Sequence, residues 1–190
     1  MPIYNDNRMF LFHPEMRTTI ARGLAEKIRD HGIDPEVIAG TATAGIPHGA
    51  LLADRLSLPY IYIRDKPKAH GLKNRIEGLD AASDLGGRRV VVIEDLISTG
   101  GSSARAVEAV REARGDCTWC LSIFSYGLEK AAEQFKALDP QCNFESLLTF
   151  PLLLDVAKVG GFLSEEQIAL LEEWRMDPFG WGEKHGFPKA

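Results

Sequence analysis

The sequence has few cysteines, no long apolar run and no excess of positive charge. Three cysteines among 190 residues are too few for the disulfide framework of a small secreted domain. The N-terminus lacks a charged stretch followed by an apolar one, and no apolar run approaches the ~18 residues that span a membrane. Lys and Arg number 22 against 27 Asp and Glu, a net charge of −5, which disfavours nucleic-acid binding. We therefore expect a cytosolic (cytoplasmic) protein that binds neither nucleic acid nor membrane.

The three cysteines are expected to be buried thiols. Cys117 and Cys120 belong to the segment CTWC in an apolar, strand-like run, where side chains three residues apart face opposite ways. A redox pair with this spacing would instead open a helix. We interpret both, together with Cys142, as structural core residues and not as a metal or redox site.

Helical and strand-like segments alternate along the chain. With 45% hydrophobic residues, the chain is long enough for one compact domain over residues 1–190. Amphipathic spacing predicts a helix from Pro14 until Gly32. Further strands are expected at 37–39, 60–64, 90–93 and 118–125, and further helices from Pro47, at 104–113 and at 128–136. This order predicts the α/β class, with a mostly parallel twisted sheet flanked by helices.

The C-terminal part shows one clear helix signal. Ser164 and Gln167 have the spacing of a capping box, and Ile168, Leu171 and Trp174 share one face of the helix that follows. Pro178 should end that helix, which would leave the remaining residues as a loose tail.

The segment VVVIEDLISTGGSS, residues 90–103, carries the most chemical information. A buried strand delivers two carboxylates, Glu94 and Asp95, and then a turn rich in glycine and hydroxyl groups that enters a helix. Gly100 and Gly101 let the backbone approach a ligand, and N–H groups and hydroxyls from Ser98 to Ser103 can surround phosphate oxygens at the helix N-terminus. Carboxylates accept hydrogen bonds from ribose hydroxyls. The segment therefore predicts a ribose 5-phosphate site.

Neither a purely structural turn nor a different nucleotide-binding motif fits this segment as well. An ordinary strand-to-helix turn with a capping residue would account for the short turn but not for the whole string. Neither a Gly-Lys-Ser/Thr phosphate loop nor G-x-G-x-x-G is present, which disfavours a Walker-type nucleotidase and a Rossmann dehydrogenase.

The same segment resembles the phosphoribosyl pyrophosphate (PRPP) signature of type I phosphoribosyltransferases, in the form found in orotate phosphoribosyltransferases. The resemblance extends to PIYNDNR, IAGTATAGIPHGALLADRL, YIRDKPKAHGLKNRIEG and LLEEWR, and so covers nearly the whole chain. It implies Mg²⁺ held mainly through PRPP and not by protein ligands, and an orotate contact at Ser98. The PRPP contacts that it implies within the signature are Glu94, Asp95, Leu96, Ile97, Ser98, Thr99, Gly100, Gly101 and Ser102.

A basic segment lies between the second strand and the signature. It contains Arg64, Lys66, Lys68, His70, Lys73 and Arg75. Its composition predicts a mobile cationic loop that could cover a departing pyrophosphate, although a merely solvated charged loop would have the same composition. The resemblance implies PRPP contacts at Arg64, Lys68 and His70, and a homodimer in which this loop reaches the neighbouring active site. We expect Lys68 to be the chief catalytic cation and Asp95 the second catalytic residue.

Two further segments bear on the leaving group and the base. Residues 41–45 resemble the pyrophosphate loop of the family, which often contains a non-proline cis peptide; Ala44 stands where some members have lysine. Asp65 likewise stands where some members have lysine. An arginine that some members use for the base is absent around Tyr126 and Gly127, as it is in other branches of the family.

The remaining aromatic and histidine residues are assigned no direct role. Trp119 and Trp174 are interpreted as core or interface residues. The histidines outside the basic segment, His13, His31, His48 and His185, are expected in turns or at the surface.

The resemblance implies transfer of ribose 5-phosphate from PRPP to orotate. Two alternatives stay open: a phosphoribosyltransferase for another base, and a PRPP-binding paralogue without catalytic activity. The second arises because residues 2–8 resemble a segment that family members reach only after an earlier stretch of chain. Without that cover, we expect near-family affinity for PRPP but poor binding or conversion of orotate.

Overall fold

The computed structural model describes residues 2–65, 75–80 and 83–187. The chain divides into two compact units. The larger unit contains Asn7–Leu147, and the smaller contains Met1–Asp6 together with Leu148–Ala190. A single domain over the whole chain therefore stays a prediction. No helix in the described ranges is long and apolar enough to cross a membrane.

The larger unit is built on a six-stranded sheet of order β3-β2-β1-β4-β5-β6. β1 pairs in parallel with both β2 and β4, β4 pairs in parallel with β5, and only the short β3 is antiparallel to its neighbour β2 among these pairings. The strands are β1 (Val37–Thr41), β2 (Tyr60–Ile63), β3 (Ile76–Glu77), β4 (Arg89–Ile97), β5 (Asp116–Ser125) and β6 (Asn143–Thr149). The α/β class and the mostly parallel sheet are thus confirmed.

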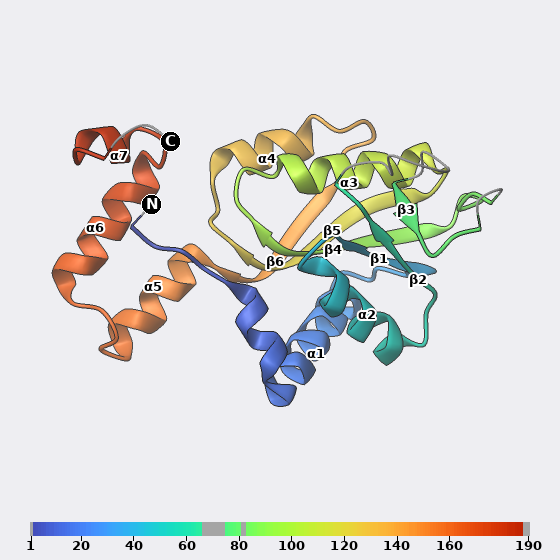
Figure 1. Cartoon of the computed structure of the whole chain (residues 1–190), viewed down its shortest axis with the longest axis horizontal. Helices are drawn as coiled ribbons and strands as arrows, with labels where there is room; N and C mark the ends of the chain where they lie inside the picture. Colours follow the sequence, from blue (N-terminus) through green and yellow to red (C-terminus); the bar gives the residue numbers. More distant parts are fainter. Residues whose placement is uncertain (1, 66–74, 81–82, 188–190) are drawn as a thin grey trace. The chain divides into compact units, whose positions relative to one another are not determined.

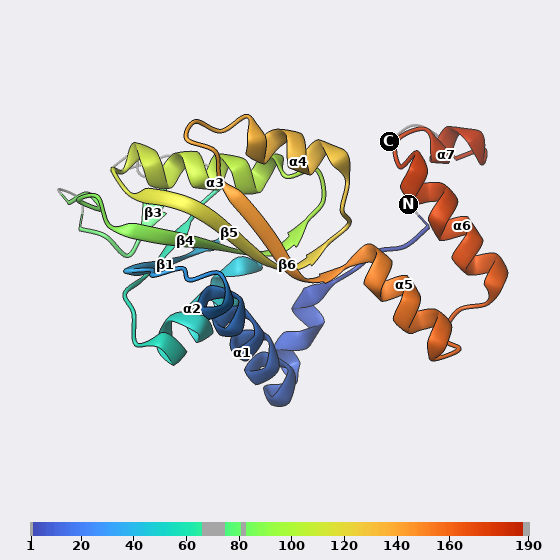
Figure 2. The same cartoon turned by 180° about the vertical axis from the view of Figure 1, so that it is seen from behind.

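Helices cover both faces of this sheet (Figures 1 and 2). One face carries α1 (Pro14–Asp30) and α2 (Gly45–Leu56), and the other carries α3 (Gly101–Glu112) and α4 (Glu129–Lys136). A short 3-10 helix, η1 (Asn7–Phe12), precedes α1. The expected helices are all present, but α2 begins two residues before Pro47, at Gly45.

The side chains of β4 alternate between the two faces, as strand geometry requires. Val90 and Val92 pack with Val107 of α3 in one buried cluster. Val91 and Ile93 pack with residues of α1 and α2 in a second cluster. Because β4 continues to Ile97, the carboxylates Glu94 and Asp95 lie within the strand and not in the turn that follows.

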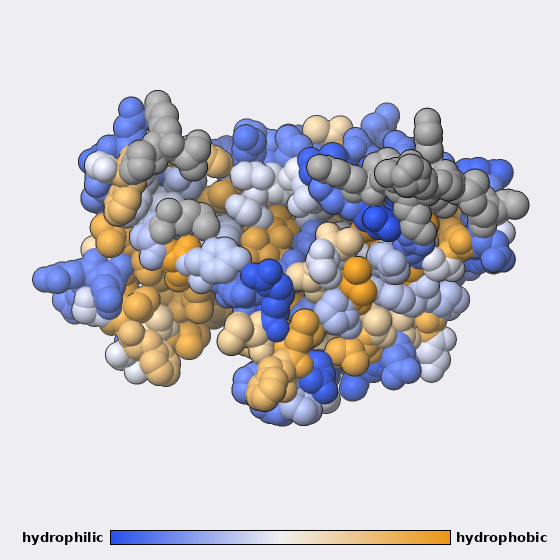
Figure 3. Space-filling view, in the orientation of Figure 1, coloured by the Kyte–Doolittle hydropathy of each residue, from blue (hydrophilic) through white to orange (hydrophobic). Residues whose placement is uncertain are grey.

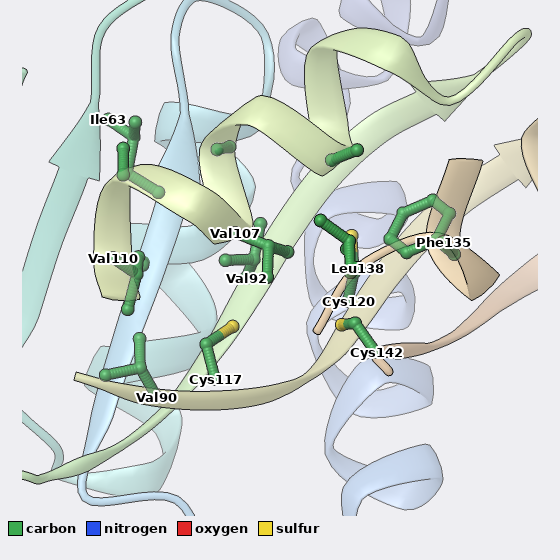
Figure 4. Close-up of a cluster of buried hydrophobic side chains, with 14 of the residues drawn as sticks. Ile63, Val90, Val92, Val107, Val110, Cys117, Cys120, Phe135, Leu138 and Cys142 are labelled. Carbon is green, nitrogen blue, oxygen red and sulfur yellow. The ribbon is translucent and has the colours of Figure 1, made fainter. Parts of the chain in front are cut away.

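The three cysteines lie in one buried cluster with Val107 (Figure 4). All are free and no more than 1% exposed, so the expectation of buried thiols is confirmed. The expectation that Cys117 and Cys120 face opposite ways is wrong. A register shift occurs where Arg89 pairs with Asp116 but Val91 pairs with Trp119, and the extra residue in β5 changes the phase of the alternation.

The smaller unit contains α5 (Phe150–Val159), α6 (Glu165–Met176) and α7 (Trp181–Lys184). The predicted capping box is present, because Ser164 Oγ accepts from the Gln167 N–H at 3.2 Å and Gln167 Oε1 accepts from the Ser164 N–H at 2.9 Å. The three residues expected on the buried face, Ile168, Leu171 and Trp174, are buried.

The segment after Pro178 is not a loose tail, because it forms α7 with Trp181 only 5% exposed. Within the segment Trp181 stacks on His185 and Phe187, and Lys184 and His185 both pair with Glu173 of α6. The smaller unit also exposes large apolar side chains on α5 and just after it, including Val156, Val159 and Phe162. The C-terminal helices show a concentration of apolar surface in Figure 3.

Candidate functional site

The carboxyl ends of β1 and β4 form the edge at which the predicted site lies. The two strands are neighbours, but the chain leaves them in opposite directions: β1 leads through α2 to β2, and β4 leads through α3 to β5. The two helices therefore lie on opposite faces, and the turns that follow β1 and β4 lie at the same edge of the sheet. In open α/β sheets such a topological switch point is the usual ligand site.

The turn from β4 into α3 has the features of a phosphate-binding site. Gly100 is the residue before the helix, with a positive φ of 78°, and no side chain caps the helix. The first N–H groups of a helix point outward without intrahelical partners and favour an anion. A Cβ at Gly100 would also lie 3.0 Å from Ala131 Cα of α4. Glycine is required here by both the backbone conformation and the close packing.

The Ser103 hydroxyl does not face this phosphate-binding turn. Its side chain is fully buried, and its hydroxyl donates to Glu94 Oε2 at 3.2 Å. The sequence-based expectation that Ser103 also faces the phosphate is therefore wrong, because the helical turn directs it back towards β4. Ser102, in contrast, is exposed, and Ser98 and Thr99 are half-buried.

Glu94 is enclosed on the α3 face of the sheet. The Thr41 hydroxyl donates to its Oε1 at 2.7 Å, and the Asp95 N–H donates to the same oxygen at 3.0 Å. Burial, with a smaller contribution from a hydrogen bond with the Asp95 side chain, raises the pKa of Glu94 to about 8. Burial therefore favours the protonated form of Glu94, and the hydrogen bonds of its carboxyl group join the ends of β1, β4 and α3.

Asp95 is more open than Glu94. Glu94 is 7% exposed, whereas Asp95 is half-buried. The backbone of Asp95 is fixed at both ends, since its N–H donates to Glu94 and its carbonyl accepts from Asn7 Nδ2 at 2.7 Å. Asn7 is itself buried. The backbone of Asp95 is thus fixed at this edge, and the residue is only partly buried.

The turn after β1 also reaches this edge. The peptide bond between Ala42 and Thr43 is cis, which is a feature that the resemblance predicted. α2 then begins without a side-chain cap. A Cβ on Gly45 would lie 2.6 Å from the Ile93 carbonyl oxygen, so glycine lets the first turn of α2 pack directly against β4.

The cationic residues are only partly described. Arg64 follows β2 and pairs with Glu77 of β3 at 3.3 Å. Asp65 pairs with Arg105 of α3 at 3.5 Å, so Asp65 carries a guanidinium partner from the helix next to the phosphate cradle. Lys68 and His70 lie outside the described residues.

Two residues at this edge had no role in the sequence-based assignment. Asn7 belongs to the segment PIYNDNR, whose resemblance to the family was the available signal. His48 was expected in a turn or at the surface, and this expectation is wrong: it lies in the first turn of α2 and is 1% exposed. Nothing in the local sequence shows that the turn after β1 places this histidine against the sheet.

The sequence of the chain is similar to those of a known family of proteins. The model of the phosphoribosyl transferase domain matches residues 9–138. The orotate phosphoribosyltransferase of Halalkalibacterium halodurans is 48% identical over 179 residues, which are 93% of this chain and 81% of that protein. The orotate phosphoribosyltransferase of Staphylococcus saprophyticus is 51% identical over 174 residues, 92% of this chain and 83% of that protein.

A solved structure gives the same result for the fold. The crystal structure of orotate phosphoribosyltransferase from Aeropyrum pernix superposes with a TM-score of 0.69 at 26% identity, over 85% of each chain. The matched segment of the family model includes both turns at the switch point.

Proposed function

The chain belongs to the orotate phosphoribosyltransferases, and from this premise we propose that it transfers ribose 5-phosphate from PRPP to orotate. The products are orotidine 5′-monophosphate and pyrophosphate, as in the biosynthesis of pyrimidines. The observation that carries the assignment of the site is the half-buried Asp95 carboxylate next to the uncapped N-terminus of α3. A diol acceptor beside a phosphate cradle suits a ribose 5-phosphate.

The roles of the residues follow from their positions. The 5′-phosphate would bind at Thr99, Gly100, Gly101 and Ser102, and the backbone of Leu96 and Ile97, at the end of β4, would lead into this turn. Asp95 would accept hydrogen bonds from the ribose hydroxyls. Glu94, enclosed and with a pKa raised by burial, would support this edge more than it contacts the sugar. Ser98 would lie at the junction with the orotate pocket.

The chemistry requires stabilisation of negative charge on the leaving group. The bond between the anomeric carbon and pyrophosphate breaks while the sugar gains oxocarbenium character, and a ring nitrogen of orotate attacks that carbon. Arg64, Lys68 and His70 would bind the pyrophosphate, with Lys68 the chief catalytic cation, because cations placed where charge develops lower the barrier. The uncapped start of α2 would offer N–H groups to the same group.

Mg²⁺ is proposed as the cofactor, held mainly by PRPP itself. Phosphate oxygens and water are the hard ligands that Mg²⁺ prefers, and the Asp95 carboxylate gives the edge a negative charge compatible with a cation carried by the substrate. When bound, Mg²⁺ would neutralise part of the charge of pyrophosphate.

The decisive measurement is formation of orotidine 5′-monophosphate from orotate and PRPP by the purified protein. Adenine, hypoxanthine and uracil serve as comparison substrates, and a preference for one of these would reject orotate as the base. A PRPP-binding paralogue without activity would instead show PRPP binding in calorimetry and no product with any base.

A homodimer with shared active sites is also proposed, on the basis of the family resemblance. Lys68→Ala should lower kcat by about 100-fold or more, because its charge acts mainly in the transition state. Mixing Lys68→Ala subunits with Asp95→Asn subunits should restore one working site per heterodimer. If activity does not recover, the loop and Asp95 act within the same subunit.

A further inference from the structure

His48 is a buried histidine whose ring nitrogens have no hydrogen-bond partner in the part of the chain that the structure describes. The residue is 1% exposed, and neither Nδ1 nor Nε2 finds a partner. Leaving a buried polar group unpaired costs roughly 1–3 kcal/mol, and most buried polar side chains are paired. An apolar side chain would fill this space without that cost, which points to a function for the imidazole.

The position of His48 on α2 directs its side chain towards the sheet. Gly45 lies three residues before His48 and Leu52 four residues after it, and Gly49 is the next residue. All three lie on the side of α2 that packs against the strands. A Cβ on Gly45 would meet the Ile93 carbonyl oxygen at 2.6 Å, and one on Gly49 would meet Gly40 Cα at 3.1 Å. Leu52 packs with Ile93 in the same buried cluster. His48 is therefore enclosed between α2 and the ends of β1 and β4.

Asp95 is the charged group that acts on His48. Burial lowers the pKa of the imidazole, and the negative charge of Asp95 partly opposes that effect. Gly45, three residues before His48 on α2, packs against the carbonyl group of Ile93, two residues before Asp95, so His48 lies near the same end of β4. The carboxyl group of Asp95 also shares a hydrogen bond with Glu94. Asp95 therefore has two neighbours: Glu94, which is hydrogen-bonded to its carboxyl group, and His48, whose ring nitrogens make no hydrogen bond within the described ranges.

We propose that His48 is a positioning residue, which donates a hydrogen bond to the Asp95 carboxylate when PRPP is bound. This bond would fix one carboxylate oxygen and leave the other directed at the ribose hydroxyls. The proposal rests on the proposed function, since it assigns Asp95 to the ribose. A carboxylate held between two partners is better preorganised than one held by Glu94 alone.

The first test replaces the imidazole of His48 by an apolar side chain in the 190-residue chain. His48→Leu should leave the Tm unchanged or raise it, because an unpaired polar group is removed. The same variant should lower kcat/KM for PRPP by about tenfold, the loss expected for one hydrogen bond to a charged group. KM for orotate should stay unchanged. If His48 only fills space, His48→Leu will retain wild-type kcat/KM for PRPP.

A second variant separates the hydrogen bond from the shape of the side chain. His48→Asn keeps an N–H donor, so it should retain clearly more activity towards PRPP than His48→Leu. Leu52→Met, on the same face one turn further on, provides a control that changes packing without removing a donor. Equal losses in His48→Asn and His48→Leu would overturn the proposal.

Coupling to Asp95 is tested by a double-mutant cycle. In an Asp95→Asn background, His48→Leu should cause little further loss of kcat/KM for PRPP, because the acceptor carboxylate is already gone. Additive losses would show that His48 acts independently of Asp95 and would reject the positioning role.

Nitrogen-15 NMR of the histidine rings gives a result that does not depend on turnover. The His48 signals, assigned by their absence in His48→Leu, should shift when Mg²⁺ and PRPP are added, and this shift should be lost in Asp95→Asn. If calorimetry shows PRPP binding but the His48 signals do not change, the positioning role of His48 is wrong and the proposed function is unaffected. Absence of PRPP binding would instead reject the proposed function.

Discussion

Glu94 and Asp95 are adjacent in β4 but lie in different environments. Glu94 is enclosed by Thr41 and Ser103 on the α3 face, with its pKa raised by burial to about 8. Asp95 is half-buried at the edge of the sheet, and its carbonyl group accepts a hydrogen bond from Asn7. Its negative charge acts to raise the pKa of His48 of α2, against the larger effect of burial. The two carboxyl groups at this strand end therefore have different surroundings: Glu94 supports the structure, and we propose that Asp95 contacts the ribose.

The largest expected effect comes from removing the charge of Asp95. Asp95→Asn should lower kcat/KM for PRPP by about 100-fold or more, because the ribose hydroxyls lose a charged acceptor. Its Tm should change little, since Asp95 is half-buried. Steady-state kinetics and thermal melting measure both quantities. Glu94→Gln is the matched comparison, and a smaller kinetic loss in that variant is expected; equal losses would contradict the division of roles.

The second-largest expected effect is on stability, and it comes from the close packing of Gly45 of α2 against β4. Gly45→Ala should lower the free energy of unfolding by about 2–3 kcal/mol, because the added methyl group would meet the Ile93 carbonyl oxygen at 2.6 Å. Gly101→Ala is the matched control at the start of α3, since its added methyl group would lie 3.5 Å from Arg105. Urea unfolding compares the two, and a similar stability in both variants would show that the α2 start is not tightly packed.

The third effect is a pH dependence caused by Glu94. Its pKa is raised from 4.5 to about 8 by folding, so the folded state binds a proton that the unfolded state has released. Wild-type stability should therefore fall as pH rises from about 4.5 to about 8. Glu94→Gln cannot ionise and should lack this contribution, so its stability relative to wild type should improve over that range. Parallel stability curves for the two proteins would reject the raised pKa.

The smallest expected effect comes from removing the hydrogen bond that the Ser103 hydroxyl donates to Glu94. Ser103→Ala should lower the free energy of unfolding by about 1 kcal/mol, the usual contribution of one buried hydrogen bond. Ser102→Ala, at an exposed position one residue earlier, should stay within about 0.5 kcal/mol of wild type. Chemical denaturation distinguishes them. If the order of the two variants is reversed, Ser103 does not support Glu94.

Much of the site was accessible from residue type and spacing. The segment from Val90 to Ser103 predicted a buried strand, a glycine turn and a helix start, and the structure has each of them. Family resemblance added the cis peptide after β1. The direction of Ser103 was not predictable in the same way, because a hydroxyl in the first helical turn can face either the ligand or the strand.

The sequence by itself determined the alternation of strands and helices, the glycine- and hydroxyl-rich turn before α3 and the pair of carboxylates, because each depends on residues that are close along the chain. Only the tertiary structure decided the tasks of those carboxylates. Thr41, Asn7 and His48 reach Glu94 and Asp95 from segments at least 46 residues away. The bulge in β5 that brings Cys117 and Cys120 to one face likewise depends on pairing with β4. Contacts between distant segments set burial and hence proton affinity, and no local pattern encodes them.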